Sequence, residues 1–348
     1  MISTNLDKRK AWLWAERFRP MNLDEVIIPD EIKAQFRKFI ADKELPNLLL
    51  TSTSPGTGKT TTAYALCNEL GIEKPLFLNA SLRNSIDDIR QDVMQYATTM
   101  SLYESTSHKV VIFDEADRLS PAAMDSLKGI IEEVHKNCRF ILTANNKSKI
   151  IEPLQSRLTN IDFRFSKTES DKMMAKMLRR VFGILDETET IYSKPAVAGI
   201  VKAFFPDNRR LLTFLQLEAK SGAIDEGTLA KASSTSPEAL IEAMKGKKYK
   251  DVQAFVINNS DRFTEDFYER LFKMLESQIP EQSVPQLVLI LGEYQRYDAI
   301  VPSKYIHFLA LCTEIMMQVP FSSWRRPSDR RRSIYRRTRR GASRAESA

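Results

Sequence analysis

Ser54-Pro55-Gly56-Thr57-Gly58-Lys59-Thr60 is the stretch of sequence that decides the fold of this chain. It follows a short apolar run, residues 47–51, that predicts a buried strand, and it precedes residues 60–70, whose apolar spacing predicts a helix. A glycine-rich turn between a strand and a helix directs backbone N–H groups and the positive end of the helix dipole to one place, where phosphates bind. The stretch therefore predicts a phosphate-binding loop in a parallel α/β sheet.

The side chains of this loop are of the types that bind a nucleoside triphosphate. Gly56 and Gly58 allow the backbone to approach phosphate oxygens, and Lys59 is expected to reach the β- and γ-phosphates. In the pattern G-x-x-x-x-G-K-[ST] the first glycine is replaced here by Thr53, which leaves the loop geometry at that position open. The loop residues expected to contact ATP are Ser54, Pro55, Gly56, Thr57, Gly58, Lys59, Thr60 and Thr61.

A second stretch, Val110-Val111-Ile112-Phe113-Asp114-Glu115-Ala116-Asp117, supplies acidic partners for the loop. Its four apolar residues predict a buried strand, and ligands of open α/β sheets bind at the carboxyl ends of such strands. We expect Thr60 and Asp114 to hold Mg²⁺, and Glu115 to polarise the water that attacks the γ-phosphate. The two stretches together predict a nucleotide hydrolase.

Length and composition exclude several other classes of protein. A chain of 348 residues exceeds one compact core, so two or three domains are expected. No apolar stretch approaches the roughly 18 residues of a membrane span, and residues 1–14 lack the apolar core of a secretory signal. The three cysteines and three histidines are scattered without ligand spacing, which argues against a zinc site or a disulfide framework. We therefore expect a soluble protein of a reducing compartment.

The net charge of +7 comes from the end of the chain. Residues 321–348 hold ten arginines against Asp329 and Glu346, so residues 1–320 are close to neutral. This tail is poor in apolar residues and is expected to be disordered. Three interpretations stay open: an electrostatic arm for DNA phosphates, a neutral solvated extension, or an ending altered by a shifted reading frame.

Apolar runs and helical patterns divide the chain into an α/β part and an all-helical part. Strands are expected at Leu48–Leu50, Leu76–Leu78, Val110–Phe113, Phe140–Thr143 and Ile161–Phe165. Beyond them, helical patterns cover 170–182, 195–205 and 208–221, and a linker is expected at 233–236. The expected domains are a P-loop sheet domain (1–167), a small helical domain (168–232), an all-helical block (233–320) and the basic tail (321–348).

Four further segments give the chain a resemblance to AAA+ clamp-loader ATPases. They resemble the N-terminal box, the sensor-1 element, the segment that ends in Ser-Arg-Cys in the small subunits, and the start of sensor 2. The segments are Trp14-Ala15-Glu16-Arg17-Phe18-Arg19-Pro20 with Leu23-Asp24-Glu25-Val26, Thr143-Ala144-Asn145-Asn146, Ile150-Ile151-Glu152-Pro153-Leu154-Gln155-Ser156-Arg157, and Pro206-Asp207-Asn208-Arg209-Arg210. The chain is most similar to the large subunits of T4-type phage sliding-clamp loaders, relatives of replication factor C.

This resemblance implies a fold and further site residues. The sheet domain would be an AAA+ ATPase domain, the small helical domain its lid, and the last block an oligomerising collar. Asn145 would contact the attacking water or the γ-phosphate, although a turn-forming asparagine would fit the same position. Arg157 would act in trans at a neighbouring subunit's ATP, with Leu158 in place of the family's cysteine. Arg209, or Arg210, would be sensor 2, unless the pair is a solvated helix start.

The resemblance also implies where adenine, DNA and the clamp bind. The N-terminal box, with Arg19, Val26 and Ile27, would pack near adenine, and part of it would be plain core. DNA contacts without sequence preference would come from Arg83, Ser85, Ile86, Arg90 and Lys128, while Gly129 stands where the family often has a second basic residue. Apolar side chains before a polar loop would contact the clamp or belong to the core; these are Tyr96, Met100, Leu102 and Tyr103.

The function implied is that of an ATP-driven clamp loader. The chain would assemble with copies of itself and a dissimilar loader subunit, open a sliding clamp and place it on primer–template DNA in the cytoplasm of a bacterial host. Two other interpretations fit the motifs: an AAA+ helicase or branch-migration motor, and a scaffold that binds nucleotide without hydrolysing it. The motor would need a DNA-reading winged helix, which the sequence does not suggest, and nothing in the motifs disarms hydrolysis.

Overall fold

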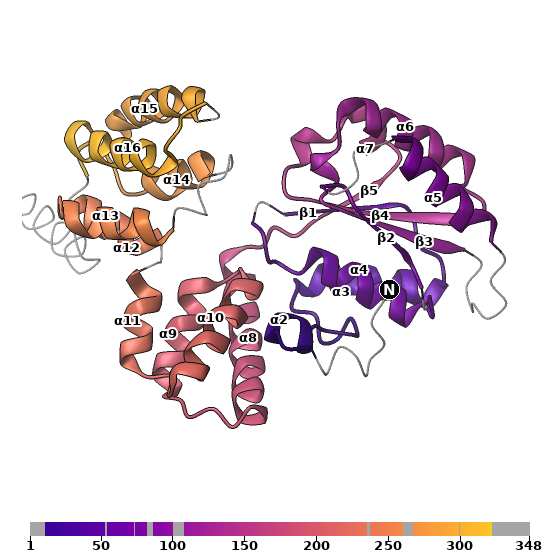
Figure 1. The fold of residues 1–348 in the computed structure, drawn as a ribbon, viewed down its shortest axis with the longest axis horizontal. Helices are drawn as coiled ribbons and strands as arrows, with labels where there is room; N and C mark the ends of the chain where they lie inside the picture. The colour runs from indigo at the N-terminus through magenta and orange to yellow at the C-terminus, as the bar shows by residue number, and fades with distance from the viewer. Residues whose placement is uncertain are drawn as a thin grey trace, which may run out of the picture. The chain divides into compact units, whose positions relative to one another are not determined.

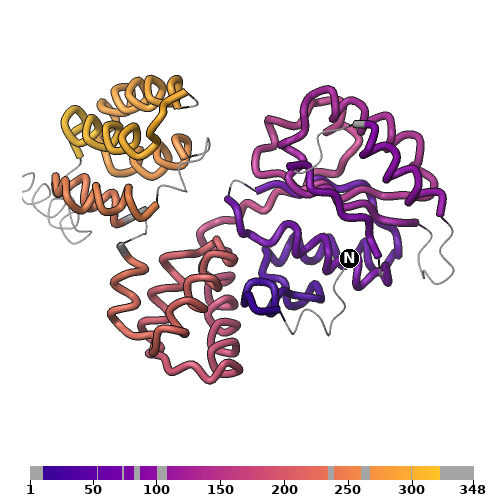
Figure 2. The backbone as a smooth tube through the Cα atoms, viewed as in Figure 1, coloured from indigo at the N-terminus to yellow at the C-terminus, as the bar shows by residue number. Residues whose placement is uncertain are grey.

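The computed structural model describes residues 11–52, 54–72, 74–81, 86–99, 108–234, 237–259, 267–298 and 300–321 (Figure 1). The chain divides into two compact units, Met1–Ser233 and Ser234–Ala348 (Figure 2). The first unit holds a β-sheet with its helices and a separate group of helices, and the second unit is helical. The basic tail expected over residues 321–348 lies outside the described residues from position 322 onward.

A five-stranded parallel sheet organises the first unit. Its strands are β1 (Leu48–Thr51), β2 (Leu76–Asn79), β3 (Lys109–Asp114), β4 (Cys138–Ala144) and β5 (Thr159–Asp162), in the order β2-β3-β4-β1-β5. All four pairings are parallel, as the sequence predicted. The last strand was predicted at 161–165 but lies earlier in the chain, at Thr159–Asp162. The strand β5 pairs with β1, which ends at Thr51, so its ladder closes with the N–H of Phe163 on the carbonyl of Thr51.

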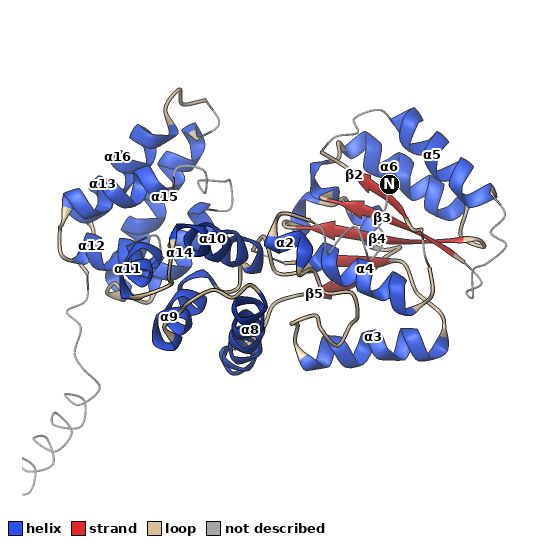
Figure 3. Ribbon diagram, turned by 60° about the horizontal axis from the view of Figure 1, so that its bottom comes forward, coloured by secondary structure: helices blue, strands red, loops and turns tan. Residues whose placement is uncertain are grey.

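Alternating apolar residues of the strands bury both faces of the sheet. Leu49, Val111 and Leu142 pack under α5 (Ile86–Thr98) and α6 (Pro121–Glu133). Leu48, Ile112 and Ile141 pack under α3 (Asp30–Asp42) and α4 (Lys59–Glu69) on the other face, an arrangement visible in Figure 3. Because the central strands β1, β3 and β4 are buried along most of their length, the polar residues that bind ligands gather at the strand ends.

Helix boundaries in this unit follow local signals. Helix α4 begins at Lys59, directly after Gly58, which has a left-handed backbone (φ 96°) that a glycine adopts without strain. Helix α6 begins after Ser120, whose hydroxyl accepts the N–H of Ala123, and has Pro121 in its first turn. The shorter helices are α2 (Trp14–Arg17), η1 (Ala116–Arg118), η2 (Lys147–Lys149) and α7 (Glu152–Gln155).

Four helices follow the sheet in the same unit: α8 (Lys167–Glu187), α9 (Lys194–Phe204), α10 (Asn208–Ser221) and α11 (Glu226–Ser234). Helix α8 starts three residues earlier than predicted because Ser166 and Glu169 form a capping box. Helix α11 runs through Ser234, so the linker expected from Ser233 does not begin there. The side chain of Trp14 of α2 is buried in this helical core, and the backbone N–H of Trp14 donates to Gln216 Oε1 (2.9 Å).

The second unit consists of α12 (Pro237–Lys245), α13 (Tyr249–Asn258), α14 (Phe267–Glu276), η4 (Glu281–Ser283), α15 (Val284–Tyr297) and α16 (Lys304–Gln318). They close around one apolar core in which Phe308 and Leu311 are fully buried. The sequence predicted this all-helical block correctly. Within the described part of the chain, every helix falls short of the length and apolar character needed to cross a membrane.

Candidate active site

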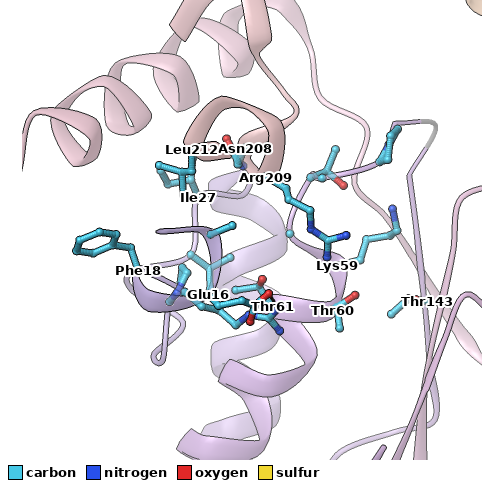
Figure 4. Close-up of a pocket in the computed structure, with 18 of the residues that line it drawn as sticks. Glu16, Phe18, Ile27, Lys59, Thr60, Thr61, Thr143, Asn208, Arg209 and Leu212 are labelled. Atoms are coloured by element: carbon cyan, nitrogen blue, oxygen red, sulfur yellow. Dashed lines mark hydrogen bonds and ion pairs between the residues drawn. The ribbon is translucent and has the colours of Figure 1, made fainter. Parts of the chain in front are cut away.

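A cleft opens at the carboxyl ends of the strands in the first unit. It is lined by the loop before α4, the N-terminal segment around α2, the ends of β3 and β4, helix α8, and the first two turns of α10. Figure 4 shows Lys59 and Arg209 directed into the same part of the cleft, with Ile27 and Leu212 side by side in another part. The cleft thus has a cationic region next to the glycine-rich loop and an apolar region against the N-terminal segment.

Lys59 lies at the centre of the cationic region. Its ammonium group donates to Asn145 Oδ1 (2.9 Å) and to the carbonyl of Ser54 (3.4 Å). Burial lowers the pKa of Lys59 to about 8, although the carboxylates of Asp117 and Asp114 favour the charged form. The contact brings together the two residues that the sequence placed on the β- and γ-phosphates, although they are far apart in the chain.

Asp114 and Thr60 are also in direct contact. The Thr60 hydroxyl donates to Asp114 Oδ1 (2.6 Å), and the Thr143 hydroxyl donates to the same oxygen (2.7 Å). Thr143 in turn accepts the backbone N–H of Glu115 (3.1 Å). Sequence reasoning placed Thr143 in the sensor-1 segment but gave its side chain no role of its own, although its position at the end of β4, two residues before Asn145, was a signal that it lies at the site.

Glu115 has an unusual backbone. Its φ of 56° lies in the left-handed region, which non-glycine residues adopt rarely and at a cost, and which is common at functional sites. Its Oε2 accepts a hydrogen bond from the hydroxyl of Ser81 (2.5 Å), which follows β2. The carboxylate is therefore held toward the end of β2 in this structure.

Asp117 holds the loop that carries Asn145. Its Oδ2 accepts the backbone N–H groups of Asn145 (3.2 Å) and Asn146 (3.1 Å), while its Oδ1 is buried without a hydrogen-bond partner. The sequence interpretation passed over this aspartate. It lies in η1, three residues after Asp114 at the end of β3.

The glycine-rich loop touches the start of α10. The N–H of Asn208 donates to the carbonyl of Gly56 (3.2 Å), and a Cβ at Gly56 would lie 2.0 Å from Asp207 Oδ1. Gly56 also has a φ of 73°, so both the space and the backbone require glycine there. Burial raises the pKa of Asp207. Thr53, the departure from the motif, lies outside the described residues.

The two candidate sensor-2 arginines point in different directions. Arg209 lines the cleft (Figure 4), whereas the guanidinium of Arg210 lies over the ring of Phe204, 5.1 Å from its centroid. Helix phase explains the difference, because consecutive residues of a helix lie about 100° apart around its axis. Of the pair, Arg209 is therefore the residue that reaches the cleft.

Most of the other predicted ATP contacts line the same cleft. They are Arg19, Val26, Ile27, Pro55, Thr57, Gly58 and Thr61. Ser54 contributes its carbonyl to Lys59 but is not among the lining residues. Residues of the lining that the sequence interpretation missed include Glu16, Phe18, Met177, Arg180, Asn208 and Leu212.

Three predicted functional cations lie away from the cleft, and each is paired with an acid of α6. Arg157 Nε donates to Glu132 (2.5 Å), Arg90 to Glu133 (3.1 Å), and Lys128 to Asp125 (3.0 Å). Arg83, Ser85 and the side chain of Ile86 lie outside the described residues, as do Met100, Leu102 and Tyr103. Tyr96 packs partly buried against the core, and its hydroxyl donates to the carbonyl of Lys74 (2.9 Å).

Family models match both parts of the first unit. Residues 49–166 match the model of the AAA ATPase family associated with various cellular activities. Residues 169–230 match the model described as the sliding-clamp-loader large subunit, AAA+ ATPase lid domain. The boundary between the two matches falls at the start of α8.

Curated relatives extend the similarity over most of the chain. It is 33% identical to the sliding-clamp-loader large subunit of Escherichia phage RB69, and 31% identical to that of Enterobacteria phage T4. In both cases the match covers 92% of this chain and 99% of the relative. The replication factor C small subunit 2 of Pyrobaculum arsenaticum is 35% identical over 80% of this chain and 88% of its own length.

Among solved structures, the Thermotoga maritima RuvB Holliday junction branch migration motor covers 62% of this chain and 71% of its own, with a TM-score of 0.47 and 19% identity. That likeness is too distant to bear on activity. The phage relatives, by contrast, match this chain almost from end to end. The AAA model and the lid model agree with them. The chain belongs to the sliding-clamp-loader large-subunit family of AAA+ ATPases, and it is a nucleotide-binding ATPase of clamp loading.

Proposed function

We propose that the cleft binds ATP with its phosphates at Lys59 and its base against residues 18–27, and that hydrolysis there drives the loading of a sliding clamp. The observation that carries this proposal is the contact of Lys59 with Asn145, next to the contact of Thr60 with Asp114. Two pairs of residues from distant parts of the chain meet where the loop directs its N–H groups. Each pair has the donor and acceptor types that a triphosphate and its cation require.

The donor set at Thr60 and Asp114 fits Mg²⁺. Mg²⁺ prefers hard oxygen ligands and is usually bound by few protein groups together with substrate phosphates and water. A hydroxyl and a carboxylate oxygen 2.6 Å apart at the mouth of the loop provide such ligands. Bound Mg²⁺ would neutralise charge that develops on the phosphate oxygens. Thr143 holds Asp114 from the other side, so the carboxylate keeps its orientation.

Glu115 and Asn145 are the groups proposed to act on the attacking water. Glu115 accepts a proton from that water as it attacks the γ-phosphate in line, and Asn145 orients the water or the phosphate. In this structure Glu115 is hydrogen-bonded to Ser81 and Asn145 to Lys59. Both side chains must give up these partners when they act on ATP. Their positions therefore depend on what binds in the cleft and on what binds near Ser81, beyond the end of β2.

The site is completed in trans by Arg157 in this proposal. Arg157 lies at the edge of the sheet domain after α7, and its side chain is 35% exposed. A guanidinium supplied by a neighbouring copy stabilises transition-state charge, and such arginine fingers contribute about 10³–10⁵ in rate. Arg209 would bring the lid onto the same phosphates from within the chain.

The relatives' names supply the partners that we propose. We propose that the chain assembles with copies of itself and a dissimilar loader subunit, acts on a sliding clamp at primer–template DNA, and works in the cytoplasm of a bacterial host, because two relatives are phage proteins. Residues 1–167 would form the ATPase domain, 168–232 its lid and 233–320 an assembling collar. Arg83, Ser85, Ile86, Arg90 and Lys128 would contact DNA phosphates.

The test measures ATP hydrolysis by the assembled loader with and without the cognate clamp and primed DNA. We expect stimulation by clamp and DNA in the wild type, and its loss in Lys59→Ala, Glu115→Gln and Arg157→Ala. Arg164→Ala is the matched control, because Arg164 is an exposed arginine of the same unit that pairs only with its neighbour Asp162. Hydrolysis that ignores clamp and DNA, or that survives Lys59→Ala, would refute the proposal.

A further inference from the structure

The guanidinium of Arg180 comes from the lid helix α8 and lines the ATP cleft. One of its terminal nitrogens donates to the carbonyl of Glu25 (2.8 Å), and the other donates to the carbonyl of Phe18 (2.6 Å). Burial lowers the pKa of Arg180. One side chain of the lid is therefore bonded to two backbone groups of the N-terminal segment, on either side of Pro20.

This guanidinium is half-buried without a carboxylate in ion-pair contact. Among the described residues, no acidic oxygen lies within 4.0 Å of Arg180, and the nearby Glu25 carboxylate instead accepts the N–H of Met21 (3.0 Å). A buried charge is costly unless hydrogen bonds satisfy it, and each hydrogen bond to a charged group is worth about 1.5–3 kcal/mol. The hydrogen bonds to the two carbonyls compensate this charge, and both carbonyls belong to the same backbone segment.

That segment is the apolar wall of the cleft, residues 18–27. Its middle is attached to the sheet domain, because the N–H of Leu23 donates to Glu69 (2.5 Å) and the Asn68 amide donates to the carbonyl of Met21 (3.1 Å). Its flanks at Phe18 and Glu25 are held by Arg180. Phe18, Val26 and Ile27 of the wall line the cleft next to Met177 and Leu212 of the lid.

We propose that Arg180 is a positioning residue for recognition of the base, which makes the base-binding wall a shared part of the lid and the sheet domain. The proposal rests on the proposed function in one respect, that adenine lies against residues 18–27. Nothing in the phosphate region is hydrogen-bonded to Arg180: Lys59, Thr60 and Asp114 make their contacts with one another, Asn145, Thr143 and the loop. Arg180 therefore supports the part of ATP affinity that depends on the base, and not the part that depends on the triphosphate.

The experiment separates these two parts of the affinity. Full-length protein is loaded with a fluorescent ATP analogue, which is displaced by ATP or by inorganic tripolyphosphate, a ligand without base or ribose. We expect Arg180→Met, which removes both hydrogen bonds, to weaken ATP about tenfold or more, since the loss of even one charged hydrogen bond predicts about tenfold, and to leave tripolyphosphate within about twofold of the wild type. Arg180→Lys keeps the charge and one donor nitrogen, so its ATP affinity is expected to lie between those of Arg180→Met and the wild type.

Arg179→Met is the matched control, because Arg179 is the exposed neighbour on α8 and does not line the cleft. Unchanged tripolyphosphate binding shows that Arg180→Met is folded. Equal weakening of ATP and tripolyphosphate would overturn the inference, and so would an ATP affinity no lower than that of Arg179→Met. The proposed function fails on a different result, namely retention of tripolyphosphate binding by Lys59→Ala.

Discussion

Replacing Thr143 by valine tests whether the end of β4 positions the hydrolytic groups. Valine keeps the shape and strand preference of threonine but has no hydroxyl, so the bonds to Asp114 (2.7 Å) and to the N–H of Glu115 (3.1 Å) both disappear. Thr143 is buried, and water cannot readily replace the hydroxyl. The bond to the Asp114 carboxylate alone is worth about 1.5–3 kcal/mol, which corresponds to about a tenfold to hundredfold lower kcat if it acts only in positioning.

The assay is steady-state ATP hydrolysis by the DNA-stimulated loader, with KM and kcat determined separately. We expect KM to stay within about twofold of the wild type, because Lys59 and the glycine-rich loop keep their contacts. Thr143→Ser restores the hydroxyl and should recover most of kcat. The reasoning is refuted if Thr143→Val hydrolyses ATP at the wild-type rate, or if serine rescues no better than valine. A lower melting temperature with unchanged kcat would assign Thr143 to stability alone.

Three other outcomes follow from the site. Gly56→Ala places a Cβ against Asp207 at a left-handed φ, a backbone cost of about 1–2 kcal/mol. It should therefore lower the melting temperature by several degrees and weaken ATP binding. Gly129→Ala, which has open space around it, should have neither effect. Lys59 is charged below its pKa of about 8, so equilibrium titrations should find ATP affinity of the free protein roughly flat below pH 7 and falling by up to about tenfold per unit above pH 8; constant affinity to pH 9 would contradict this. Mixing inactive Lys59→Ala protein with inactive Arg157→Ala protein should restore hydrolysis if Arg157 acts in trans, because some interfaces then join an intact cleft to an intact arginine; no recovery in mixed assemblies would place Arg157 outside the neighbouring site.

The sequence predicted the parts of the fold that depend on neighbouring residues. The apolar run and glycine turn before α4 are local signals, and so are the cap of α6 and the apolar strand before Asp114. The last strand was displaced because its end is set by the partner strand β1, which stops at Thr51. A boundary that depends on pairing is invisible in the residues of one strand.

The same distinction explains which site residues were missed. Lys59, Asp114 and Asn145 carry side chains whose chemistry suggests a role by itself. Thr143 and Arg180 act through backbone groups and through strand or helix adjacency, so their residue types carry no signal. The choice between Arg209 and Arg210 also required the structure, because only the phase of α10 against the cleft distinguishes two adjacent arginines.

The acids of α6 pair with the three cations for which we propose contacts to DNA or to a neighbouring ATP. Glu132, Glu133 and Asp125 pair with Arg157, Arg90 and Lys128, and all three pairs are partly or largely exposed. An exposed ion pair contributes only about 0–1 kcal/mol, so a phosphate group can displace each carboxylate. Under the proposed function, the carboxylates would also reduce the attraction of a lone subunit to DNA. One helix, α6, carries all three acids. If DNA replaces an acid as the partner of Arg90 or Lys128, the change therefore occurs on the same helix that holds the proposed trans arginine, Arg157.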